Sequence, residues 1–153
     1  MKKLGKIFFT ILIFGLFIVF PAAAQKTKSD FQKMYMDFLK KKGYNTTILE
    51  DGDIRFVIEG SGFFIVVNEK EPQNFQIYTF MSLENRSKQI TLAAANNTNG
   101  KSYGTKVWIS DDGTHAVFII ENILLKPKDF QQIFDKALAS IVESIYYFLA
   151  EIK

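Results

Sequence analysis

Residues 51–81 read DGDIRFVIEGSGFFIVVNEKEPQNFQIYTFM, and this stretch decides the fold. Asp51-Gly52 and Gly60-Ser61-Gly62 are turn signals, and each precedes a short run of β-branched and aromatic residues. Apolar residues alternate along the first run, which indicates a strand. The second run, FFIVVN, is apolar on both faces, which is typical of a central strand covered on both sides. The predicted strands of this antiparallel meander are Thr46–Glu50, Asp53–Glu59, Phe63–Asn68 and Asn74–Met81.

Helical periodicity flanks the meander. Phe31, Tyr35 and Leu39 share one helix face after a capping-box pattern at Ser29 and Gln32, and Gly43 is suited to end that helix. A second helix is predicted over Glu84–Asn97, with Ile90, Ala93, Ala94 and Asn97 on one face. Two strands, Tyr103–Ser110 and His115–Leu124, follow it, and a long helix is predicted to start at Pro127. The order α-β-β-β(-β)-α-β-β-α predicts an α+β fold whose helices pack on one face of an antiparallel sheet.

The first 24 residues predict where the protein works. Three lysines precede the apolar run Ile7–Phe20, and Ala22-Ala23-Ala24 provides small residues before Gln25, so residues 1–24 have the pattern of a cleaved signal peptide. The run has 14 residues, fewer than the about 20 that span a bilayer, although extending it to Ala24 keeps a membrane anchor as the alternative. We therefore expect an exported protein, periplasmic or extracellular, without a stable anchor after cleavage, with residues 25–29 as a flexible tether and 30–153 as one domain.

Removing the leader also changes the charge. Three of the 19 basic residues lie in it, which leaves 16 Lys and Arg against 16 Asp and Glu. A neutral mature chain lacks the basic balance typical of nucleic-acid binding, so we expect no nucleic-acid partner.

The order of elements and several specific segments resemble the YbjN-like domain family, which shares its fold with the type III secretion chaperones. The resemblance covers roughly residues 30–153. The resemblance implies a non-enzymatic, chaperone-like or regulatory module that binds protein chains, commonly as a homodimer. The segments that carry it are Lys42-Gly43-Tyr44, Glu50–Ile54, Leu92 with Asn96-Asn97, Lys106–Ile109, Asp111-Asp112-Gly113, Phe130 and Phe148-Leu149.

Residues suited to catalysis or metal binding are few. The chain has no cysteine, which excludes disulfides and thiolate zinc sites. His115 is the only histidine, with Asp111 and Asp112 as its nearest acids, and a second acidic turn lies at Glu50, Asp51 and Asp53. Neither turn has the spacing of a calcium-binding loop. We therefore expect no enzyme activity and no cofactor.

Aromatic residues make up 15% of the chain, and they predict where a partner binds. Helices on one face leave the other face of the sheet open, and large exposed apolar patches are typical of interfaces. The predicted function is binding of a protein partner or of a second copy; the alternative is a carrier of a small apolar ligand or lipid in a cavity beside the Phe130 helix. The predicted interface residues are Phe64, Val66, Tyr78, Phe80, Tyr103 and Trp108.

Overall fold

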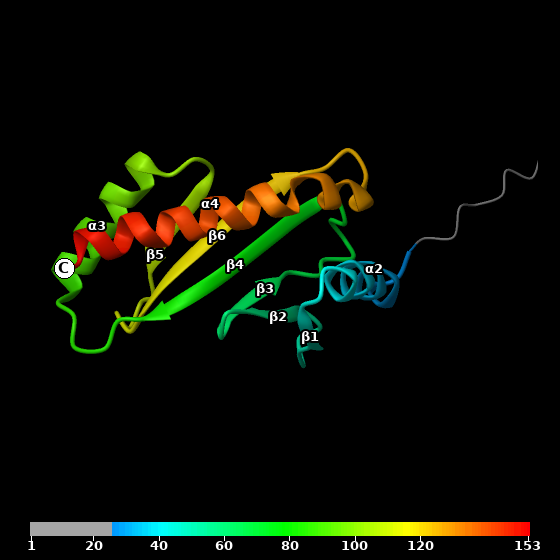
Figure 1. Ribbon diagram of the computed structural model, residues 1–153, viewed down its shortest axis with the longest axis horizontal. Helices are drawn as coiled ribbons and strands as arrows, with labels where there is room; N and C mark the ends of the chain where they lie inside the picture. Colours follow the sequence, from blue (N-terminus) through cyan, green and yellow to red (C-terminus); the bar gives the residue numbers. More distant parts are fainter. Residues whose placement is uncertain (1–25) are drawn as a thin grey trace, which may run out of the picture.

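The computed structural model describes residues 26–153, so the predicted signal peptide lies outside the described residues (Figure 1). The predicted order of helices and strands and the α+β class are confirmed. The elements are α2 (Lys28–Lys41), β1 (Asn45–Ile48), β2 (Ile54–Ile58), β3 (Ser61–Ile65), β4 (Asn74–Ser82), α3 (Lys88–Lys101), β5 (Thr105–Ile109), β6 (His115–Ile123), the 3₁₀ turn η1 (Pro127–Asp129) and α4 (Phe130–Glu151).

The six strands form one antiparallel sheet in the order β1-β2-β3-β4-β6-β5. The first four strands make the meander that the turn signals predict. The strands β4 and β6 then pair along their whole lengths, from Asn74 opposite Ile123 to Ser82 opposite His115. This is the longest strand pair of the sheet, and β1 and β5 are the two edge strands.

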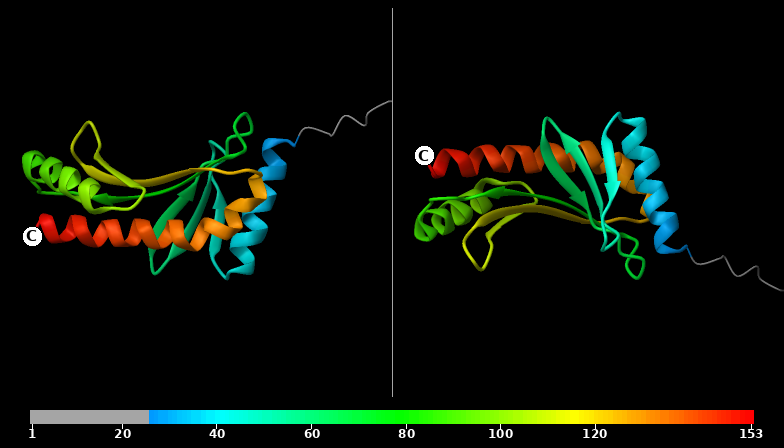
Figure 2. Two further views of the ribbon diagram at one scale, coloured as in Figure 1. Left: turned by 90° about the horizontal axis from the view of Figure 1, so that it is seen from above. Right: turned by 90° about the horizontal axis from the view of Figure 1, so that it is seen from below.

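Helices α2 and α4 cover one face of the sheet (Figure 2). Helix α2 packs on β1 and β2, whereas α4 lies along β4, β5 and β6. Aromatic rings fill the junction between the two helices: the centroid of Phe130 lies 4.7 Å from that of Tyr35, and Phe134 lies 5.1 Å from Phe38 and 5.7 Å from Phe56. No helix within residues 26–153 combines the length and hydrophobicity that a membrane crossing requires.

Both ends of α2 are closed by hydrogen bonds. The capping box predicted at Ser29 and Gln32 is wrong: it is formed two residues earlier, where the Thr27 N–H donates to Asp30 Oδ2 (2.8 Å) and the Asp30 N–H donates to Thr27 Oγ1 (3.3 Å). The predicted end at Gly43 is confirmed. Gly43 has a φ of 84°, and the Gly43 and Tyr44 N–H groups donate to the carbonyls of Lys40 and Leu39.

Helix α3 differs from the prediction in both range and face. It runs over Lys88–Lys101 instead of 84–97, and Ile90 is 53% exposed although it was expected on the buried face. The buried residues of α3 are small: Thr91, Ala94, Ala95 and Thr98. Small side chains allow α3 to pack closely against α4 and β5, which hydrophobicity alone does not reveal. Helix α4 is preceded by η1, which begins at Pro127 as predicted.

Candidate protein-binding surface

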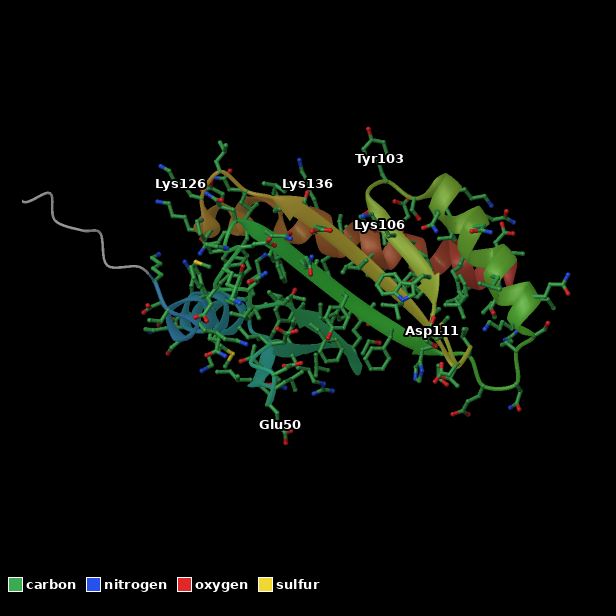
Figure 3. All side chains as sticks on the ribbon, turned by 180° about the vertical axis from the view of Figure 1, so that it is seen from behind. Glu50, Tyr103, Lys106, Asp111, Lys126 and Lys136 are labelled. Carbon is green, nitrogen blue, oxygen red and sulfur yellow. The ribbon has the colours of Figure 1, made fainter. Side chains whose placement is uncertain are left out.

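The face of the sheet opposite α2 and α4 carries a contiguous apolar cluster. We call it the aromatic face and define it as Phe64, Tyr78, Phe80, Val117 and Trp108. Strand register brings these residues together, because Phe64 lies opposite Tyr78, and Val117 lies between Phe80 and Trp108 on the neighbouring strands. Figure 3 views the molecule from this side, with β4, β6 and β5 in front of α4.

Three rings of the aromatic face are stacked. Phe64 lies between Tyr78 and Phe80, at centroid distances of 4.9 and 5.5 Å, and each ring pair is within 16° of parallel. The stack leaves Phe64 only 8% exposed, whereas Phe80 is 50% and Trp108 45% exposed. As predicted, β3 is an interior strand and its apolar residues are buried on both faces. On the face opposite the helices, however, neighbouring side chains of the sheet cover Phe64. The half-exposed ring of Phe80 therefore packs on a buried aromatic ring.

The aromatic face has a polar border at one end. The side-chain amides of Asn74 and Gln76 donate to Glu121 Oε1 at 2.7 and 3.0 Å, and these hydrogen bonds lower the pKa of Glu121. Val66 is half-buried, and the hydrogen bond from its N–H to the Gln76 carbonyl places it beside this border. Partial burial, with smaller contributions from Asp53 and Asp51, raises the pKa of Tyr78. Tyr78 therefore keeps its hydroxyl proton near neutral pH and can donate a hydrogen bond to a partner.

Two basic residues flank the central row of this face. Arg55 lies opposite Phe64 on β2, and Lys106 lies opposite Ile119, which in turn lies opposite Tyr78. The row thus runs from a positive residue through apolar side chains to a second positive residue. This arrangement suits a partner segment that has apolar side chains with acidic groups near its ends.

Of the six predicted interface residues, the structure brings five to this side of the sheet and places Tyr103 apart from them. Tyr103 is 92% exposed in the loop between α3 and β5, and its carbonyl accepts a hydrogen bond from Ser140 Oγ (2.6 Å) on α4. It lines a shallow hollow with Ile133 and Ala139 of α4, away from Trp108. Val117, which the prediction omitted, completes the aromatic face; its alternation with Phe118 along β6 is the signal that could have found it.

His115 and the acidic turns are engaged in local structure. Asp112 accepts hydrogen bonds from Ser110 Oγ (2.6 Å) and from the N–H and Oγ1 of Thr114, and these bonds lower the pKa of Asp112 to about 2. Thr114 Oγ1 also lies 2.6 Å from His115 Nδ1. The network closes the β5–β6 turn. The other acidic turn, at Asp51, lies at the opposite edge of the sheet, and residues 26–153 contain no group of His, Asp or Glu that could hold a metal ion.

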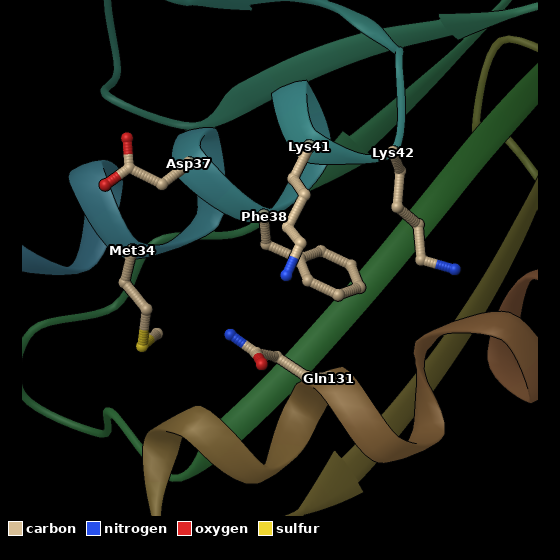
Figure 4. A pocket seen from close by; sticks show the side chains of 6 residues that line it. All are labelled: Met34, Asp37, Phe38, Lys41, Lys42 and Gln131. Atoms are coloured by element: carbon tan, nitrogen blue, oxygen red, sulfur yellow. The ribbon is translucent and has the colours of Figure 1, made fainter.

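A groove of about 590 Å³ lies on the helix side, between α2 and the start of α4 (Figure 4). Met34 and Phe38 form its apolar wall, and Lys41 and Lys42 lie at its rim. The Lys42 ammonium is 2.6 Å from both carboxylate oxygens of Asp135 and lies 5.5 Å from the centroid of Phe38. Its charge is therefore compensated, so the groove lacks the strong positive field that a free lysine pair would provide.

One functional feature that the sequence did not reveal is the protection of the β5 edge. The Asn99 side chain donates to the Val107 carbonyl (2.8 Å) and accepts from the Val107 N–H (2.7 Å). This amide pairs with a peptide group of the strand as a neighbouring strand would. Since unpaired edge strands invite association with other chains, Asn99 protects β5 from such pairing.

Comparisons with known proteins agree with this architecture. No protein-family model and no curated protein matches the chain in sequence. The structure is similar to YbjN from E. coli, with a TM-score of 0.59 and 11% identity over 77% of this chain and 88% of that chain. It is also similar to chains of the ExsC–ExsE complex (TM-score 0.57, 11% identity, 80% and 94% covered) and of the HopA1–SchA chaperone–effector complex (0.53, 10%, 76% and 94%). The chain therefore has a YbjN-like fold, which a chain of the chaperone–effector complex shares.

Proposed function

We propose that this protein is an exported, non-enzymatic, chaperone-like module that binds a segment of another protein chain on its aromatic face. The observation that carries this proposal is that Phe80 and Trp108 are about half exposed on the same face, with Phe80 stacked on Phe64 and Trp108 beside Val117. Aromatic side chains on a fixed base lose little conformational freedom on binding, which makes them effective anchors. Solved structures of similar fold, as a chaperone–effector complex and as the ExsC–ExsE complex, support protein binding.

The test places a photoreactive phenylalanine analogue at Phe80 in the native host. We expect cross-links to a discrete protein chain. The matched control carries the analogue at Tyr103, an aromatic residue that is 92% exposed and lies apart from the aromatic face in the loop between α3 and β5. Trp108→Ala should reduce cross-linking from position 80 and leave the thermal unfolding midpoint nearly unchanged. Equal cross-linking from both positions, or none from position 80, would refute binding on the aromatic face.

Homodimer formation belongs to the same proposal as an alternative use of the aromatic face. Sedimentation at increasing concentration measures it directly. If the face binds a second copy, Phe80→Ser shifts the protein to monomer and the cross-link from position 80 joins two copies. A concentration-independent monomer with cross-links to a different chain assigns the face to a heterologous partner.

Export is tested separately. N-terminal sequencing of the protein recovered from the host should begin at Gln25 if the leader is cleaved after Ala24. An intact N-terminus in the membrane fraction would support the anchor instead.

A second candidate function is the carrier of a small apolar ligand or lipid. The observation that favours it is a groove of about 550 Å³ between the β2–β3 hairpin and the second half of α4, with Phe63, Ile145 and Leu149 among its walls. Native mass spectrometry of the purified protein should then show a bound lipid that Ile145→Glu abolishes. Phe80 also borders this groove, whereas Trp108 does not. Cross-linking from an analogue at position 108 should therefore be unaffected by Ile145→Glu, which separates the two functions.

A further inference from the structure

The end of the domain where β6 leads into η1 presents two aliphatic side chains to solvent. Ile123 is 88% and Leu125 is 90% exposed, while Leu124 between them is 7% exposed and packs into the core. Among the large aliphatic residues that the structure describes, these two are the most exposed. We call residues 123–128 the tip loop.

The tip loop is held in a defined conformation. The Leu124 N–H donates to the Gln73 carbonyl (2.8 Å), which ties the loop to the preceding turn of the meander. The Lys126 N–H donates to Asp129 Oδ2 (3.0 Å), and Pro127 begins η1. The exposure of Ile123 and Leu125 is therefore a feature of an anchored loop.

Two basic residues lie directly after these two aliphatic residues in the chain. They are Lys126 and Lys128, and within the described residues neither ammonium forms an ion pair. Acidic residues are present at this end too, but backbone N–H groups already bind several carboxylates: Asp129 accepts from Lys126, and Glu69 accepts from Lys28. The charged groups near this end include Lys26, Lys28, Lys70, Lys126, Lys128, Asp30, Glu69, Glu71, Glu121 and Asp129, and the Glu121 carboxylate accepts hydrogen bonds from Asn74 and Gln76.

The described chain also begins at this end of the domain (Figure 1). The Lys28 N–H, at the start of α2, donates to Glu69 in the loop that adjoins Gln73. Only residues 21–27 separate the apolar run Ile7–Phe20 from α2, and seven residues reach at most about 25 Å. While that run is in a bilayer, before any cleavage, the tip loop is held near the lipid surface.

We infer that the tip loop is a contact site for an anionic lipid surface. Ile123 and Leu125 enter the boundary between headgroups and acyl chains, and Lys126 and Lys128 bind lipid phosphates. Paired aliphatic and basic side chains are the combination that such surfaces attract. This contact does not require that the leader be retained, and it uses none of the residues of the aromatic face.

The absence of cysteine allows a direct test in the full chain. Leu125→Cys is labelled with an environment-sensitive fluorophore and mixed with vesicles of phosphatidylcholine alone or with phosphatidylglycerol. The control is Asp111→Cys, an exposed residue at the other end of β6 from Lys126 (Figure 3). We expect a blue shift and quenching by bilayer-embedded quenchers at position 125, strongest with anionic vesicles, and little change at position 111.

Lys126→Gln with Lys128→Gln should weaken the anionic-vesicle response of the position-125 label about 25-fold, about fivefold for each lysine. Equal responses at both positions, or no response at position 125, would overturn the inference. A blue shift at position 125 that needs no vesicles and grows with protein concentration would also overturn it, since it assigns the tip loop to a protein contact. The thermal unfolding midpoint of each labelled variant verifies that the fold is retained.

Discussion

Replacing Asn99 with alanine removes both hydrogen bonds that the Asn99 side chain makes to Val107 and leaves those backbone groups on β5 without a protein partner. Each bond contributes about 0.5–1.5 kcal/mol net. Alanine recovers about 0.5 kcal/mol through its higher helix propensity. We therefore expect Asn99→Ala to lower the free energy of unfolding by about 1.5 kcal/mol, which corresponds to a fall of roughly 5 °C in Tm.

The assay is urea unfolding followed by circular dichroism, together with sedimentation to detect new oligomers formed through the opened β5 edge. Asn96→Ala is the matched control, because it makes the same change on an exposed position of α3 for which no side-chain hydrogen bond is seen in the described chain. We expect this control to be unchanged or slightly more stable. If Asn99→Ala is as stable as Asn96→Ala and remains in the same oligomeric state, the inference that Asn99 protects the β5 edge is wrong.

Three further outcomes follow from the geometry. Gly43→Ala should lower the free energy of unfolding in urea by about 1–2 kcal/mol, because the backbone at Gly43 has a φ of 84°; an added Cβ meets no other atom there, so the loss comes from the backbone alone. Gly100→Ala, within α3, should instead raise the free energy of unfolding by up to about 1 kcal/mol. Equal effects of the two substitutions would contradict this reasoning. Phe134→Ala should lower the free energy of unfolding by about 3–5 kcal/mol, because the ring is fully buried among aromatic neighbours. A loss below about 1 kcal/mol would show that neighbouring side chains fill the space that the ring leaves. Hydrogen bonds lower the pKa of Asp112 to about 2, below its unfolded value, so the charged group stabilises the folded state fully above about pH 4. The Tm advantage of the wild type over Asp112→Asn should decrease as the pH falls from about 4 to 2, and an advantage that is undiminished at pH 2 would refute this role.

Much of the fold could be predicted because its signals are local. The spacing of Phe31, Tyr35 and Leu39 defines a helix face, and all three residues are buried in α2. Gly43 and Pro127 mark a helix end and a helix start through their own backbone preferences. These features depend on residues a few positions apart, which is the range over which sequence patterns are informative.

The range and the buried face of helix α3 could not be predicted from such local patterns. Its buried face consists of Thr91, Ala94, Ala95 and Thr98, whose hydrophobicity is too low to produce a clear period. The run of asparagines near its C-terminus suggests a helix end, yet Asn99 lies within the helix because its amide binds β5. The role of such a residue can be recognised only when its partner on a distant segment is known.

The sequence by itself determined which side chains share a face of each strand, and so it identified Phe64, Tyr78, Phe80 and Trp108 as one potential surface. Only the tertiary structure decided that this surface is open at Phe80 and Trp108, closed at Phe64, and separate from Tyr103. It also decided that Ile123 and Leu125 are exposed while Leu124 between them is buried. The physical reason is that alternation along a strand follows from backbone geometry, whereas exposure depends on which remote segments pack against each side chain.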